Sequence, residues 1–84
     1  MDREQLSKIG FNNSVSLDID PRKVMVQTEV VARDEVLIRT RVLHAGVLQA
    51  SEKHASPDAS SVEQVREAAR IQHERILEKV RQGG

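Results

Sequence analysis

Two consecutive stretches in the middle of the chain repeat their apolar residues with a period of two. This pattern constrains the fold more than any other feature of the sequence. On one face, the first stretch places Val24, Val26, Thr28, Val30 and Ala32, and the second places Val36, Ile38, Thr40 and Val42. Alternation of this kind is typical of half-buried β-strands. The polar residues 33–35 between the stretches predict a short turn that makes the two strands antiparallel neighbours.

The register of this hairpin can be tested on both of its faces. A three-residue turn at 33–35 predicts the apolar pairs Ala32–Val36, Val30–Ile38, Thr28–Thr40 and Val26–Val42. On the other face it sets Glu29 opposite Arg39, and such a pair contributes a few tenths of a kcal/mol. It also sets Gln27 opposite Arg41. Because a slip by one residue would turn every apolar side chain outward, we expect this register to be strongly specified.

A third stretch of alternating residues precedes the hairpin, with Val15, Leu17 and Ile19 as its apolar positions. The segment 20–23, Asp-Pro-Arg-Lys, has the residue preferences of a type I turn. That turn predicts the pairs Ile19–Val24, Leu17–Val26 and Val15–Thr28. The sequence therefore predicts a three-stranded antiparallel meander over residues 14–48.

Outside the meander the patterns are weaker. Residues 1–13 are expected to form a flexible N-terminal arm or a short helical turn that ends at Gly10. Residues 43–54 are compatible with a longer third strand or with the start of a helix. Residues 49–60 are rich in Ser, Ala, Pro and Asp, which predicts a linker.

An amphipathic helix is expected over residues 61–82, opened by a capping box formed by Ser60 with Glu63 or by Ser61 with Gln64. Its apolar stripe consists of Val62, Val65, Ala69, Ile76 and Val80, with Leu77 beside it and His73 within it. The expected fold is thus a single α+β domain, a meander followed by a C-terminal helix. The helix covers the apolar face of the sheet, or two copies of the chain cover each other.

Composition excludes several functional classes. The chain has 84 residues, 13 basic against 13 acidic, no cysteine, and Phe11 as its only aromatic residue. Disulfides and thiolate chemistry are therefore excluded, and aromatic platforms for base stacking are largely excluded. His44, His54 and His73 are too far apart in sequence for a zinc motif. We expect no catalytic, metal or cofactor site and, because no signal or spanning segment is present, a cytoplasmic protein without membrane contact.

Two alternatives remain open. One is a nucleic-acid-binding module that uses the local concentration of basic residues Arg22, Lys23, Arg33, Arg39 and Arg41. With a helical N-terminus, the order of elements would match double-stranded RNA-binding domains in topology alone. The other is a modifier with a Gly-Gly tail. Because Gly83 and Gly84 follow a helix and not a last strand, they are better interpreted as an ordinary helix stop.

The preferred interpretation is a small, non-enzymatic interaction or regulatory protein of bacterial type. It is expected to act as a homodimer and to bind a protein partner of unknown identity. Interface candidates lie on the helix: Val62, Val65, Ala69, Ile71, His73, Ile76 and Val80. Ile71 stands alone among charged residues and is the candidate contact for the partner.

Overall fold

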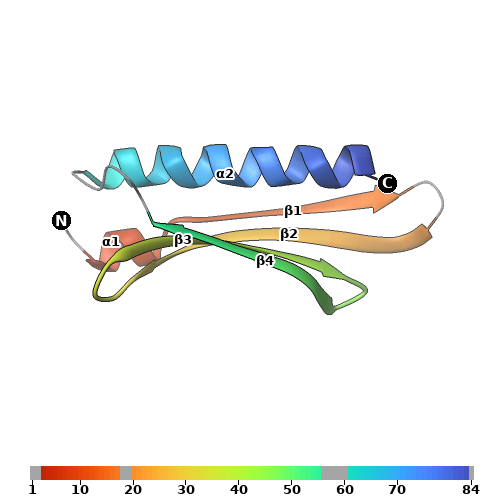
Figure 1. The fold of residues 1–84 in the computed structure, drawn as a ribbon, viewed down its shortest axis with the longest axis horizontal. Coiled ribbons are helices and arrows are strands. Elements are labelled where there is room, and N and C mark those ends of the chain that lie inside the picture. The colour runs from red at the N-terminus through yellow and green to blue at the C-terminus, as the bar shows by residue number, and fades with distance from the viewer. Residues whose placement is uncertain (1–2, 18–19, 56–60, 84) are drawn as a thin grey trace.

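The computed structural model describes residues 3–17, 20–55 and 61–83. Their elements are α1 (Arg3–Ser7), β1 (Gly10–Leu17), β2 (Asp20–Ala32), β3 (Val36–His44), β4 (Val47–Ala55) and α2 (Val62–Gly83). The strands form one antiparallel sheet in the order β1-β2-β3-β4. Helix α2 lies along one face of this sheet, and α1 sits at one end of it (Figure 1). The predicted α+β class, with a C-terminal helix on a meander, is confirmed, but the sheet has four strands instead of three.

The predicted β2–β3 register is confirmed at every position, from Ala32 opposite Val36 to Val26 opposite Val42. Glu29 and Arg39 face each other on the side of the sheet away from α2. The Arg39 Nε atom donates a hydrogen bond of 2.8 Å to Glu29 Oε1, and the Arg39 Nη2 atom contacts the same oxygen. Side-chain period and cross-strand charge were therefore sufficient to specify this hairpin.

The predicted register of the first hairpin is wrong. Strand β2 begins at Asp20, which pairs with Leu17, so residues 20–23 belong to a strand and not to a turn. The partner of Val15 is Val24 instead of Thr28, a shift of four residues. An even shift keeps every side chain on its predicted face. In the observed register, β1 pairs with β2 as far back as Gly10. This longer ladder outweighs the local turn preference of residues 20–23. The predicted Ile19 pairing lies outside the described residues.

Two further segments contain more regular secondary structure than the sequence predicted. Residues 10–13, expected in the N-terminal arm, are part of β1, and the arm itself contains α1. Residues 47–55, expected in part as a linker, form β4 after a two-residue turn. That turn has positive φ at both Ala45 (53°) and Gly46 (81°), as a tight hairpin turn requires. The fourth strand also removes the topological match to double-stranded RNA-binding domains.

The core between α2 and the sheet consists of two apolar clusters. At the α1 end, the first comprises Leu6, Ile9, Val30, Ile38, Val65 and Ala69. The second, toward the C-terminus of α2, comprises Val15, Val26, Ile76 and Leu77. Helix α2 begins as predicted, because the Gln64 amide donates to Ser61 Oγ over 3.2 Å. The alternative cap, Ser60, lies outside the described residues. The apolar stripe of the helix thus covers the sheet of its own chain.

Candidate functional site

Helix α2 covers β1, β2 and β3 but leaves β4 at the open edge of the sheet. Eight of the nine residues of β4 are exposed, and Glu52 is half-buried. The exposed apolar side chains Val47 and Leu48, at 60% and 54% exposure, stand at its start. An uncovered strand edge presents backbone N–H and C=O groups to any chain able to pair with them. Strand β4 is therefore the most accessible β-surface among the described residues.

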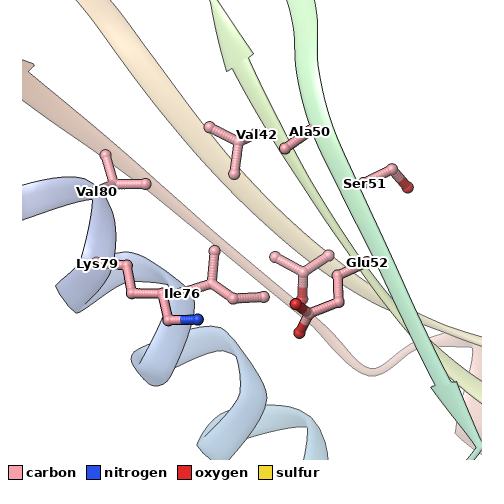
Figure 2. A pocket seen from close by; sticks show the side chains of 8 residues that line it. Val42, Ala50, Ser51, Glu52, Ile76, Lys79 and Val80 are labelled. Atoms are coloured by element: carbon pink, nitrogen blue, oxygen red, sulfur yellow. The ribbon is translucent and has the colours of Figure 1, made fainter. Parts of the chain in front are cut away.

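A groove of about 320 Å³ separates α2 from β4 (Figure 2). Its apolar lining comes from Val42 on β3, Ala50 on β4, and Ile76 and Val80 on α2. Figure 2 shows the Lys79 side chain reaching into the same space from the helix. Ala50, which lies opposite Val42 in the β3–β4 ladder, contributes a small side chain to this lining.

One ionic cluster links the helix to β4 across this groove. The Arg75 guanidinium hydrogen-bonds to Glu52, and His54 Nε2 lies 3.0 Å from the same carboxylate. The hydrogen bond from Arg75 lowers the pKa of Glu52 from its ordinary value. Because these side chains are largely exposed, the cluster contributes at most about 1 kcal/mol to stability. It positions β4 relative to α2 without covering the strand edge.

A layer of buried polar side chains lies between the two apolar clusters. Thr28 Oγ1 is 2.7 Å from Thr40 Oγ1 and 2.8 Å from His73 Nδ1. His73 Nε2 is 2.7 Å from Asn13 Oδ1. Gln72 Nε2 donates to Thr40 Oγ1 over 3.0 Å and to the Ile38 carbonyl oxygen over 3.2 Å. Every member reaches a partner, as buried polar groups require.

The order Thr28–His73–Asn13 resembles a nucleophile, a base and an orienting group. The Thr28 side chain, however, is only 3% exposed and is sandwiched between the sheet and α2. A substrate carbonyl would have to lie about 3 Å from its hydroxyl, where protein atoms already pack. Burial also lowers the pKa of His73, and the Glu74 carboxylate opposes this effect with a smaller increase. The layer is therefore built to hold the helix on the sheet and not to present a nucleophile.

The structure separates the predicted helix candidates into two groups. Val65, Ala69, His73 and Ile76 are buried against the sheet, while Val62 and Val80 are partly buried beside them. These residues form the core of the monomer, because the helix covers its own sheet. Ile71 is 55% exposed on the far side of α2 and remains available for a partner.

The predicted basic residues do not form one surface. Arg39 and Arg41 both approach Glu29 on the face away from α2, with Arg41 Nη2 3.6 Å from its carboxylate. Lys23 and Arg33 are exposed near opposite ends of β2. The Arg22 side chain lies outside the described residues. The arginines expected to meet phosphate are thus already engaged with a carboxylate.

The sequence did not predict the groove or the polar layer. The signal for β4 was present in the pair Ala45–Gly46, a short turn between two stretches with strand character, but the Ser-rich residues beyond it pointed to a linker. Gln72 went unnoticed because it lies between Ile71 and His73 on the helix, and only its contacts with β3 give it a role.

The architecture defines an α+β protein in which one long helix is laid across a four-stranded meander. Comparison with protein-family models, with curated proteins and with solved structures found no match. Within the described ranges, no group of His, Asp or Glu side chains could hold a metal ion. Neither described helix is both long and apolar enough to cross a membrane.

Proposed function

We propose that this chain is a small non-enzymatic interaction protein of the cytoplasm that works as a homodimer joined along β4. One observation carries the proposal: β4 is a nine-residue edge strand that neither helix covers. It contains no proline, which cannot donate to a ladder and protects many strand edges from pairing. The opposite edge strand, β1, packs beneath α2 through Val15 and Asn13.

Pairing of two β4 strands across a two-fold axis would make one continuous eight-stranded sheet. Both α2 helices would then lie on the same face, with the two grooves side by side along the seam. The pairing satisfies backbone groups of both edges, and an axis at residue 50 or 51 would also place the partner strand beside the apolar side chains Val47 and Leu48. With 13 basic and 13 acidic residues, net charge does not oppose association. Ile71, exposed on the outer side of α2, is the proposed contact for a separate protein partner.

Disulfide trapping tests this arrangement, because the natural chain contains no cysteine. Single cysteines are introduced in turn at positions 50 to 54 of β4. In an antiparallel pair on a two-fold axis, one residue lies opposite its own copy, with Cβ atoms about 5 Å apart. That distance is close to what a disulfide needs, so one of the five variants should cross-link to itself efficiently under mild oxidation. The others should cross-link weakly.

The matched control is Ser16→Cys, an exposed position of the other edge strand. It should remain a monomer on denaturing gels after the same oxidation. Light scattering of the unmodified protein over a concentration series should show the mass of a dimer. A monomer at about 1 mM, or equal cross-linking of Ser16→Cys and the β4 variants, would refute the β4 interface.

The contact proposed at Ile71 is tested separately by using the dimer as bait. Capture from the native cell should lose its partner when the bait carries Ile71→Ser. Equal capture by the unmodified and substituted baits would remove Ile71 from the partner surface.

A further inference from the structure

The hydrogen bonds of the buried polar layer run in one direction. The Ile38 carbonyl oxygen can only accept, so the Gln72 amide must turn its NH₂ group toward it. The same NH₂ group therefore donates to Thr40 Oγ1. Thr40, whose described partners are Gln72 and Thr28, passes its own hydrogen to Thr28, and Thr28 donates to His73 Nδ1. A backbone atom thus sets the direction of the whole chain.

This direction assigns the state of His73. Nδ1 accepts from Thr28, so it carries no proton, and Nε2 carries the proton that it donates to Asn13 Oδ1. The ring is neutral, is only 3% exposed, and lies against Phe11 with a distance of 5.5 Å between ring centroids. An imidazolium would carry a proton on both nitrogens and could accept from neither side.

Protonation would therefore reverse the chain. With a proton on Nδ1, Thr28 has to accept and must turn its own hydrogen toward Thr40. Thr40 Oγ1 then accepts from both Thr28 and the Gln72 NH₂ group, and its own hydrogen finds no acceptor among these partners. The amide cannot rotate to relieve this conflict, because its oxygen would then face the Ile38 carbonyl oxygen. One buried donor is left without an acceptor, at a site that also has to contain a positive charge.

We propose that this polar layer is an acid-sensitive latch, which holds α2 on the sheet only while His73 is neutral. Both apolar clusters join the same helix to the sheet, and the latch sits between them at residues 72 and 73. Its opening therefore weakens α2 at the middle of its contact with β2 and β3.

The charged groups around His73 do not cancel this effect. Arg70, Glu74, Glu78 and Arg81, two of each sign, line the cavity beside the ring, and all belong to α2. Among the described strand residues, Phe11, Asn13 and Thr28 contact the ring, and all three side chains are neutral. Burial lowers the pKa of His73, and Glu74 only partly offsets the decrease.

The sign of the pH dependence follows from this pKa. An unfolded histidine titrates near pH 6.5. Because the folded value is lower, the unfolded chain binds more protons between the two values, so stability falls as pH decreases through that window. Within this window, the unfolding equilibrium constant should rise about tenfold for each unit by which the pH decreases, from this one group alone. Above about pH 6.5, the contribution of neutral His73 to folding stability is fully present.

The experiment compares the slope of stability against pH, from about pH 7.5 to 5.5, in the unmodified protein and in two variants. His73→Gln removes the titrating group and should lose the slope. His54→Gln, at an exposed position of β4, should retain it. A His73→Gln variant that folds and keeps the same slope would overturn the latch.

Nitrogen NMR of the unmodified protein provides a test that does not depend on any variant folding. At neutral pH, His73 should show a protonated Nε2 and an accepting Nδ1, with a titration midpoint below that of the unfolded chain. The opposite tautomer, or a midpoint at or above the unfolded value, would equally overturn the proposal.

Discussion

Replacement of Thr40 by valine is the perturbation that most directly tests the reasoning about the buried polar layer. Valine has nearly the shape of threonine and is more apolar, so area burial alone would predict no loss, or even a gain. Thr40, however, is 1% exposed and bonds to both Gln72 and Thr28. Valine would leave one Gln72 N–H facing a methyl group and would remove the hydrogen bond to Thr28.

The magnitude follows from these two losses. A buried donor left without an acceptor costs about 1–3 kcal/mol, and the lost Thr40–Thr28 hydrogen bond costs about 1 kcal/mol more. We expect Thr40→Val to destabilise the protein by about 2–4 kcal/mol. An 84-residue chain has a total stability of roughly 4–13 kcal/mol at the usual 0.05–0.15 kcal/mol per residue. The variant should therefore lose a large share of its stability, with a decrease in Tm of roughly 10–30 °C.

Thr40→Ser is the matched control, because it keeps the hydroxyl and removes one methyl group. Its expected cost is about 1 kcal/mol. Urea unfolding followed by circular dichroism measures both variants, and an unchanged m value shows that the same transition is being compared. The serine variant should be the more stable of the two, opposite to the order of hydrophobicity. A valine variant as stable as the serine variant would refute the assignment of Thr40 as a link in the chain.

Two other predictions use the same unfolding assay. Ile76→Ala should cost about 2–4 kcal/mol because Ile76 is buried in the second apolar cluster, whereas Ile71→Ala should stay within about 0.5 kcal/mol because that side chain is exposed; equal effects would contradict the placement of the helix. Gly46→Ala should cost about 1–2 kcal/mol, since an alanine at a φ of 81° is strained. Gly10→Ala should be nearly neutral, because the added Cβ would lie 3.7 Å from the nearest atom, the Thr28 carbonyl oxygen; the reverse order would contradict the assigned hairpin turn.

The register error at β1 shows what limits prediction from the sequence. Alternation identifies the face of each side chain but not its partner, because a shift of four residues leaves every face unchanged. The turn preference of residues 20–23 is a local effect of limited size. The ladder that β1 forms back to Gly10 is longer than the predicted one, and it places Asn13 beside His73. Local preference was outweighed by contacts between distant parts of the chain.

The sequence by itself determined the β2–β3 hairpin, the C-terminal helix and its apolar stripe, because each depends on neighbours in sequence or on a repeating period. Tertiary structure alone decided that the stripe meets its own sheet, that β4 is left uncovered, and that Thr28, Thr40, Gln72 and His73 converge. Those features depend on where the helix crosses the strands. Residues 28 and 73 are hydrogen-bonded across 45 positions of chain, and no local pattern carries information over that distance.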